Sequence, residues 1–261
     1  MSALAEKRVL VTRAAEDQAE LAALLSARGA RPVALPCIAF ADPADPAPLE
    51  EALRRLRTGA APDFVVLASP HAAERFLARV DLAWLRGVRI AAAGEGTARR
   101  IVERGLPVLA PARGVGADTL VEMLAALVAG KDVLLPRAEG GNPALAAGLE
   151  RAGARVSSPV LYRTVPAPAP DPEGARLLRA GSMDAIAFAS GSAARGFAAL
   201  FGPEAAGLAG RALVACMGRT CAGDARAAGL RVDAVADGGL SELVEALESA
   251  LLSTGRPGSR G

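Results

Sequence analysis

The chain of 261 residues contains little of what several classes of protein require. Its three cysteines, Cys37, Cys216 and Cys221, are too few and too irregularly spaced for a disulfide framework or a zinc site, which favours a reducing, cytoplasmic setting. Aromatic residues make up only 3% of the chain, which argues against a nucleic-acid platform of stacked bases. A single histidine, His71, is present, and no nucleophile–base triad is apparent.

Charge and hydropathy exclude further classes of protein. Lysine and arginine total 30 against 28 aspartate and glutamate residues, so a net charge of +2 indicates no general affinity for polyanions. No signal peptide is apparent at the N-terminus, and the most apolar run, 121–135, is interrupted by Glu122, Lys131 and Asp132. We therefore expect a monomer with no membrane and no nucleic-acid partner, in which hydrophobic residues, 52% of the chain, form a large core.

A strand-helix-strand segment occurs twice, 124 positions apart. Lys7, Arg13, Leu21, Leu25, Gly29, Ala30 and Arg31 correspond to Lys131, Arg137, Leu145, Leu149, Gly153, Ala154 and Arg155. In each copy a short apolar strand ends at an arginine, and an amphipathic helix ends at a glycine before a second strand. Agreement at this many positions indicates a duplicated α/β unit.

A second pair of segments repeats as well. The run 63–71, an apolar strand that ends at Ser69 and leads directly into a helix, matches the run 184–192, in which Ser190 takes the place of Ser69. Each copy continues through a strand (89–94 or 213–218), a helix, a further strand (108–111 or 232–236) and a last helix. The chain is therefore expected to form two similar, doubly wound α/β domains with mainly parallel sheets.

Periodicity leaves two ways of pairing the repeats. The halves are either contiguous, with a division near Gly130, or the first unit joins the last block and the middle is an inserted domain. Proline-rich stretches that follow 37–40 and 162–165 favour insertion, because they are typical of paired connectors. The expected domains are 1–36 with 168–254 and 43–159, the connector strands are 37–42 and 160–167, and 255–261 form a disordered tail.

The candidate binding residues follow the expected strand ends. Ser69, Ser190 and Ser192 begin helices, and Gly94 to Thr97 and Gly218 to Thr220 read as tight strand-to-helix turns with a threonine at the cap. Ordinary turn chemistry explains any one of these loops. Four of them, two in each repeat, predict a ligand cleft between the domains, lined by hydroxyls and helix N-termini.

Other candidates are isolated residues. Arg13 and Arg137 either pair with carboxylates or cap the sheet edge. His71 lies in a first helical turn, where a solvated or capping role is favoured over catalysis. Cys221, at a helix start, is expected to pack in the core, and Tyr162, the sole tyrosine, lies on a connector beside the predicted cleft.

In order and spacing, these motifs resemble the uroporphyrinogen-III synthase family. The resemblance covers about 7–252 and rests on Val-Thr-Arg13, Ala-Ser-Pro70, Ala-Gly-x-Gly-Thr-Ala98, Leu-Pro-Arg137, Tyr162-x-Thr164, Phe-Ala-Ser-Gly-Ser192 and Gly-x-Thr-x-Ala222. It implies two α/β domains, the first discontinuous, with the active site in the cleft and no cofactor. It also implies that Tyr162 assists loss of a hydroxyl group, and that Gly94 to Thr97 and Gly218 to Cys221 contact the substrate.

The reaction implied by the resemblance is closure of the linear tetrapyrrole hydroxymethylbilane, with inversion of its last ring through a spiro intermediate, for tetrapyrrole biosynthesis. A transient contact with the preceding pathway enzyme is also consistent with it. Two residues depart from the family pattern: His71 stands where an arginine is frequent, and Cys221 where a threonine is expected.

Two other functions are compatible with parts of the pattern. A non-catalytic two-domain protein that binds small anions would share the same architecture, although the chain has no evident export signal and few aromatic residues. A nucleotide-dependent enzyme would need an intact phosphate loop, and the Gly94 turn lacks the third glycine.

Overall fold

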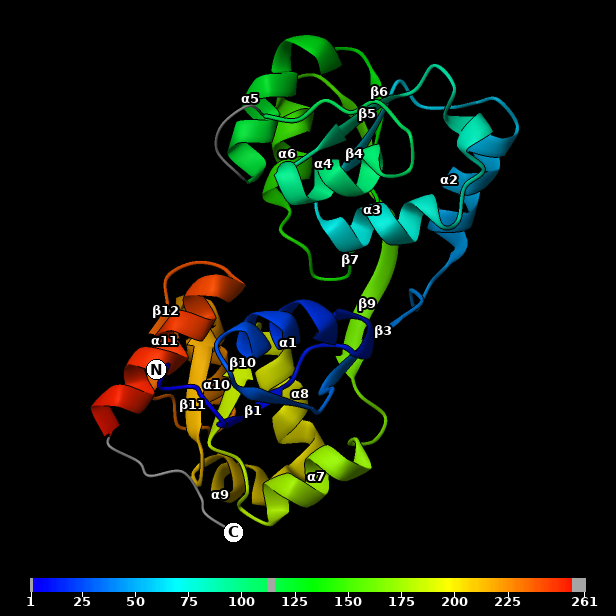
Figure 1. Cartoon of the computed structure of the whole chain (residues 1–261). Coiled ribbons are helices and arrows are strands. Elements are labelled where there is room, and N and C mark those ends of the chain that lie inside the picture. Colours follow the sequence, from blue (N-terminus) through cyan, green and yellow to red (C-terminus); the bar gives the residue numbers. More distant parts are fainter. Residues whose placement is uncertain (1, 112–115, 255–261) are drawn as a thin grey trace. The chain divides into compact units, whose positions relative to one another are not determined.

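The computed structural model describes residues 2–111 and 116–254 (Figure 1). It divides into two compact units, Met1–Phe40 with Thr164–Gly261 (unit 1) and Ala41–Arg163 (unit 2). The two junctions fall inside strands β3 (Ile38–Ala41) and β9 (Val160–Pro166). The tail expected at 255–261 lies outside the described residues.

Unit 1 is built on a five-stranded parallel sheet in the order β12-β11-β10-β1-β2. Its strands are β1 (Arg8–Val11), β2 (Arg31–Ala34), β10 (Ala185–Phe188), β11 (Leu213–Met217) and β12 (Ala234–Ala236). Val9 lies opposite Ala185, so the N-terminal strand pairs with the first strand of the last block. The three inner strands β1, β10 and β11 are mostly buried apolar residues, as is typical of parallel strands covered on both faces.

Helices cover both faces of this sheet. On one face, Leu10, Ile186 and Phe188 pack with residues of α7 (Pro172–Arg179), α8 (Gly191–Phe201), α9 (Ala205–Ala209) and α10 (Gly218–Ala227). On the other face, Val9 and Val11 pack with α1 (Gln18–Ala27) and α11 (Leu240–Thr254). Short 3-10 turns precede α1 (Ala15–Asp17) and α9 (Gly202–Glu204). The alternation of the strand side chains between two cores confirms the doubly wound α/β class.

Unit 2 contains a four-stranded parallel sheet in the order β5-β4-β6-β8. The strands are β4 (Phe64–Leu67), β5 (Arg89–Ala92), β6 (Asp132–Leu134) and β8 (Arg155–Ser157). The helices are α2 (Ala47–Arg57), α3 (Pro70–Leu77), α4 (Glu95–Val102), α5 (Ala117–Val128) and α6 (Ala144–Arg151), with a 3-10 turn at Leu82–Leu85. One core joins Phe64, Val66 and Val133 to α5 and α6, and Val65 and Leu67, which point to the opposite face, are buried as well.

The strand expected at 108–111 is reduced to one parallel bridge between Leu109 and Ala91. Pro107 and Pro111 flank this bridge, and neither can donate a backbone hydrogen bond to a neighbouring strand. The prediction of a full strand was wrong here. The bridge nevertheless occupies the edge position that β12 occupies in unit 1.

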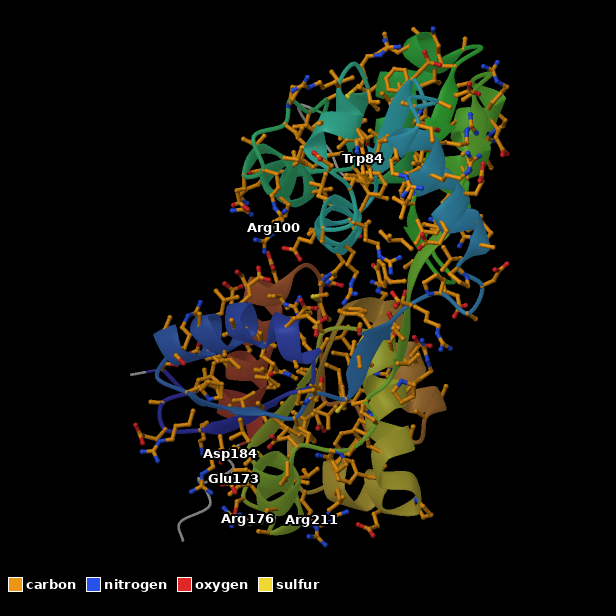
Figure 2. The ribbon with its side chains drawn as sticks, turned by 90° about the vertical axis from the view of Figure 1, so that its right-hand side faces the viewer. Trp84, Arg100, Glu173, Arg176, Asp184 and Arg211 are labelled. Carbon is orange, nitrogen blue, oxygen red and sulfur yellow. The ribbon has the colours of Figure 1, made fainter. Side chains whose placement is uncertain are left out.

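The duplication is visible in matching side-chain contacts. Lys7 Nζ lies 3.2 Å from Asp184 Oδ1, and Lys131 Nζ lies 3.2 Å from Asp63 Oδ1 (Figure 2 labels Asp184). In each unit the other oxygen of the aspartate accepts the backbone N–H that follows the lysine, at 2.9 Å. The two sheets therefore repeat the same link between their central strands.

The proline-rich stretches are only partly extended. β3 and β9 join β7 (Arg137–Ala138) in a three-stranded sheet of order β3-β9-β7. After β3 the chain enters α2, and after β9 it enters α7. Pro48 and Pro172 lie in the first turns of these helices, where a missing backbone N–H costs nothing. In the described part of the chain, no helix is long and apolar enough to cross a membrane.

Candidate functional site

A candidate site in unit 2 is a pocket of about 330 Å³ at the carboxyl ends of its parallel strands. Ala68 follows β4, Ala93 follows β5, and Leu135 and Pro136 follow β6. The remaining lining residues are Ser69, Ala72, Gly116, Ala117, Arg137, Ala138, Gly141, Asn142, Leu145 and Tyr162. Ala117 is the first residue of α5, and Ser69 and Asn142 precede α3 and α6, so the N-terminal ends of three helices border the pocket.

Three predicted site residues meet at this pocket. Ser69 reaches it from the start of α3, Arg137 from β7 and Tyr162 from β9. The Glu139 N–H donates to the Tyr162 carbonyl at 2.8 Å, which holds β9 beside the loop after β7. Residues from three distant segments of the sequence therefore converge on one cavity.

Tyr162 is 6% exposed and is held by residues of α3. The His71 ring lies edge-on to it, with 6.4 Å between ring centroids and 67° between planes. The Arg75 guanidinium carbon lies 5.4 Å from the centroid of the Tyr162 ring. His71 and Arg75 are four residues apart and so share one face of the helix. The solvated or capping role favoured for His71 from the sequence stays a prediction, and the structure places this partly buried residue against Tyr162.

The prediction that threonines cap the glycine turns was also wrong. The residue before α4 is Gly94, without a side-chain cap, and Thr97 is the third residue of the helix and only 4% exposed. Likewise, α10 begins at Gly218 and Thr220 is its third, exposed residue. The residue before α10 is Met217, which makes no side-chain cap, and Gly218 has a φ of +80°, which favours glycine.

Ser190 in unit 1 repeats the role of Ser69. Each hydroxyl accepts the N–H of the residue three positions on, Ala193 at 3.2 Å or Ala72 at 3.1 Å, and so caps its helix. Ser192 accepts a hydrogen bond from Arg195 at 3.3 Å. These hydroxyls are engaged in local structure, and a role in substrate binding stays a prediction for them.

Cys221 packs in the core, as the sequence favoured. It is 3% exposed, and its Sγ donates to the Phe188 carbonyl at 3.4 Å. Hydrogen bonding between the two thiols lowers the pKa of Cys221 and, together with burial, raises the pKa of Cys216. All three cysteines are free and buried. The resemblance implies that Cys221 contacts the substrate, and for this buried residue that contact stays a prediction.

The repeated arginines differ in their surroundings. Arg13 lies 3.3 Å from a Glu20 oxygen and 3.8 Å from an Asp17 oxygen. Arg137 donates to the Ala138 carbonyl at 3.2 Å and has no acidic partner among the residues that the structure describes. Arg13 therefore has the carboxylate partners that the sequence allowed, whereas a cap on the sheet edge stays a prediction for Arg137.

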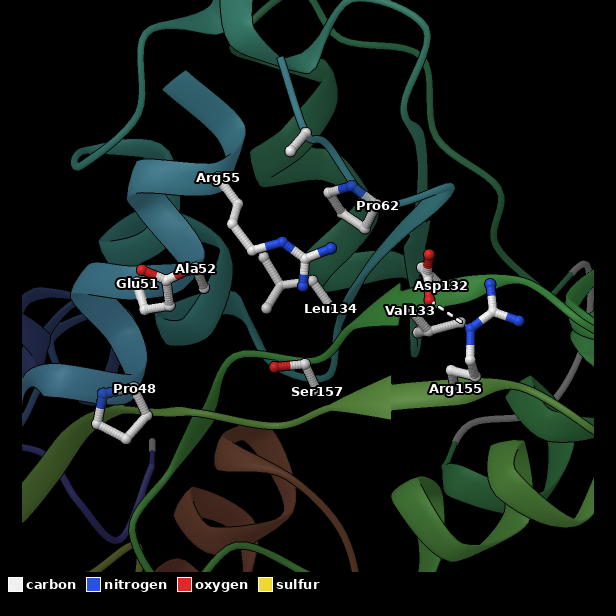
Figure 3. A pocket seen from close by; sticks show the side chains of 11 residues that line it. Pro48, Glu51, Ala52, Arg55, Pro62, Asp132, Val133, Leu134, Arg155 and Ser157 are labelled. Atoms are coloured by element: carbon white, nitrogen blue, oxygen red, sulfur yellow. Dashed lines mark hydrogen bonds and ion pairs between the residues drawn. The ribbon is translucent and has the colours of Figure 1, made fainter. Parts of the chain in front are cut away.

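A second, smaller pocket of about 90 Å³ lies between α2 and the strands β6 and β8 (Figure 3). Arg55 points into it, and Arg155 is bonded to Asp132 at 2.7 Å. The guanidinium of Arg155 lowers the pKa of Asp132, so this ion pair is charged at neutral pH. None of the predicted site residues lines this pocket, and we assign it no role in the chemistry.

The sequence interpretation missed Arg75, Asn142, Gly116 and Gly141. A signal for Arg75 was the spacing of four from His71, and a signal for Asn142 was its place before Pro143 at a helix start. Among the described residues, no group of three or more His, Cys, Asp or Glu side chains is placed to hold a metal ion.

These features define a class: a two-unit α/β protein with parallel sheets and a pocket at the strand ends of unit 2. The sequence model of the family described as uroporphyrinogen-III synthase HemD matches residues 19–239. A uroporphyrinogen-III synthase from Synechococcus elongatus is 32% identical over 200 residues, 74% of each chain. The chain belongs to the uroporphyrinogen-III synthase family.

Solved structures share the fold. A uroporphyrinogen-III synthetase from Helicobacter pylori has a TM-score of 0.59 at 18% identity, with 95% of this chain and 99% of that chain covered. A mutant uroporphyrinogen III synthase from the extremely thermophilic bacterium Thermus thermophilus has a TM-score of 0.54 at 22% identity, with the same coverage. These structures share the fold, and the family match supports the enzyme and does not favour a non-catalytic anion-binding protein.

Proposed function

We propose that this chain is a lyase that closes hydroxymethylbilane to uroporphyrinogen III, with loss of water and inversion of the last pyrrole ring. Family membership supports the reaction. The observation within the structure that carries the proposal is the convergence of Ser69, Arg137 and Tyr162 on one pocket.

The chemistry requires little covalent help from the protein. The pyrrole nitrogen pushes out the protonated hydroxyl as water, which leaves an azafulvene cation. The substituted carbon of the last ring attacks this cation to form a spiro intermediate, which fragments to a second azafulvene and recloses at the free position with loss of a proton. The enzyme must mainly hold the chain in the conformation that favours this path over direct closure to isomer I.

Tyr162 is the proposed group that assists departure of the hydroxyl. Its burial restricts the phenol to few orientations, and the contacts with His71 and Arg75 hold the ring at the pocket wall. A phenol O–H that donates to the leaving oxygen would stabilise the charge that develops as water departs. Ser69 is committed to capping α3, so its hydroxyl helps to shape the pocket.

The substrate's carboxylates require hydrogen-bond donors, and the protein must supply them although its own net charge is low. In unit 2, no side chain caps the start of α5, so its first backbone N–H groups are the proposed donors. We propose that the protein acts as a monomer without a cofactor. We also propose a cytoplasmic site of action, which the three free cysteines support. The cleft expected between the two domains stays a prediction.

A coupled assay tests the reaction. Hydroxymethylbilane is generated in place by the enzyme that makes it, this protein is added, and the oxidised porphyrin isomers are separated by chromatography. We expect a shift from isomer I to isomer III. Isomer I alone, from folded protein, would contradict the proposed function.

A further inference from the structure

The sequence around the two repeated arginines explains why their surroundings differ. After Arg13 the chain continues Ala-Ala-Glu-Asp-Gln-Ala-Glu-Leu, and after Arg137 it continues Ala-Glu-Gly-Gly-Asn-Pro-Ala-Leu. The positions of Glu16, Asp17 and Glu20 are taken by Gly140, Gly141 and Ala144 in the second copy. The second copy thus lacks the two carboxylates that neutralise Arg13.

The same replacements leave space beside Arg137. Gly141 and Asn142 line the pocket in unit 2 at positions that correspond to Asp17 and Gln18 of unit 1. Asn142 Oδ1 accepts the Ala144 N–H at 2.9 Å, which fixes the turn at the start of α6. Where Arg13 meets acidic side chains, Arg137 therefore borders a cavity.

Charge in the pocket has one sign. Of the described residues that line it, Arg137 is the only charged one, and none of them carries a carboxylate. The volume of about 330 Å³ is near the lower end of the range for ligand pockets, about 300–1,000 Å³. It suits one pyrrole ring with its acidic arms and is too small for a whole linear tetrapyrrole with eight carboxylates.

We infer that the pocket is a carboxylate subsite, in which the Arg137 guanidinium binds an acetate or propionate arm of one pyrrole ring beside Tyr162. This inference rests on the proposed function and makes it more specific. A guanidinium and a carboxylate form paired, charge-assisted hydrogen bonds, which fix orientation as well as add affinity. Arg13, already paired with carboxylates of its own unit, does not take this role.

The variants Arg137→Gln and Arg137→Lys test the subsite. Steady-state formation of isomer III gives kcat and KM, and quenching of uroporphyrin III fluorescence gives the affinity for a stable octacarboxylate. Loss of a hydrogen bond to a charged group predicts a KM and a porphyrin Kd about 10- to 100-fold higher in Arg137→Gln. Arg137→Lys keeps the charge without the paired geometry and is expected to recover part of the loss.

Arg100→Gln is the charge-matched control, since this exposed residue of α4, labelled in Figure 2, pairs with Glu74 and is not among the residues that line the pocket. Unchanged KM and Kd in both Arg137 variants, or an equal loss in Arg13→Gln, would overturn the subsite. Circular dichroism checks that each variant is folded. If the wild-type protein forms no isomer III, the proposed function fails, and the porphyrin titration still tests Arg137 as a carboxylate-binding residue.

Discussion

The guanidinium carbon of Arg75 lies 5.4 Å from the centroid of the Tyr162 ring, so a cation on α3 holds the aromatic ring of β9. Since Tyr162 lines the pocket and Arg75 does not, Arg75 acts through the ring. It is a positioning residue in the proposed mechanism. Cation–π contacts contribute about 0.5–2 kcal/mol, depending on how far they are shielded from water.

Replacing Arg75 by glutamine is therefore expected to lower kcat about 2- to 30-fold, with little change in KM. Arg75→Lys, which keeps a cation near the ring, should recover part of the activity. Arg79→Gln is the matched control, because Arg79 lies just beyond the same helix and pairs with Asp42 at 3.0 Å. In the Tyr162→Phe background, Arg75→Gln should cause no further loss of kcat; an additive loss would mean that Arg75 acts elsewhere.

Tyr162→Phe removes the phenol hydroxyl and keeps the ring. We expect a fall in kcat of about tenfold or more, since general-acid assistance is lost, while Tm changes little. The Phe ring fills the same buried space, and the hydrogen bond from the Glu139 N–H to the backbone of residue 162 remains. Isomer III formation at the wild-type rate in this variant would remove Tyr162 from the mechanism.

The parallel sheets were predictable because their inner strands include short apolar runs, such as β4 and β10, that occur twice. The repeat even predicts which contacts recur, as in the Lys7–Asp184 and Lys131–Asp63 pairs. At Leu109 the apolar run predicts a strand, but the structure has one isolated bridge, because the flanking prolines cannot donate backbone hydrogen bonds to a neighbouring strand.

The candidate site was predictable only in part. Ser69 and Arg137 could be placed at strand ends from the repeat, and Tyr162 was singled out by the family resemblance. The contact between Arg75 and Tyr162 could not be foreseen, because it depends on where β9 passes α3. Thr97 was wrongly predicted to cap α4, because the sequence pattern is the same whether the helix begins after Gly94 or at the threonine.

Gly196 on α8 lies against the chain that leads into β3. A Cβ added there would overlap the Cys37 carbonyl, which belongs to the backbone and has little freedom to move. Gly196→Ala is therefore expected to lower the free energy of unfolding by about 1–3 kcal/mol. Gly223→Ala is the matched control: this helical glycine of α10 has open space around it, and alanine should stabilise the protein by about 0.5–1 kcal/mol. Urea denaturation measures both, and equal effects would contradict the predicted overlap.

Asp63 links the central strands of unit 2, and its carboxylate should make stability depend on acid pH. The backbone N–H of Asp132, and then Lys131, lower the pKa of Asp63 below its usual value near 3.8. A group whose pKa is lowered by folding stabilises the native state above its unfolded pKa, and this contribution is lost as pH falls through the folded pKa. Asp63→Asn keeps an oxygen to accept the N–H but cannot titrate. Its Tm should therefore fall less than that of the wild type between about pH 5 and pH 2, the range in which carboxylates titrate. Lys131→Gln leaves the larger, backbone cause in place and should retain much of the wild-type pH dependence. Scanning calorimetry across this range measures both variants, and a wild-type slope in Asp63→Asn would mean that other carboxylates account for the acid sensitivity.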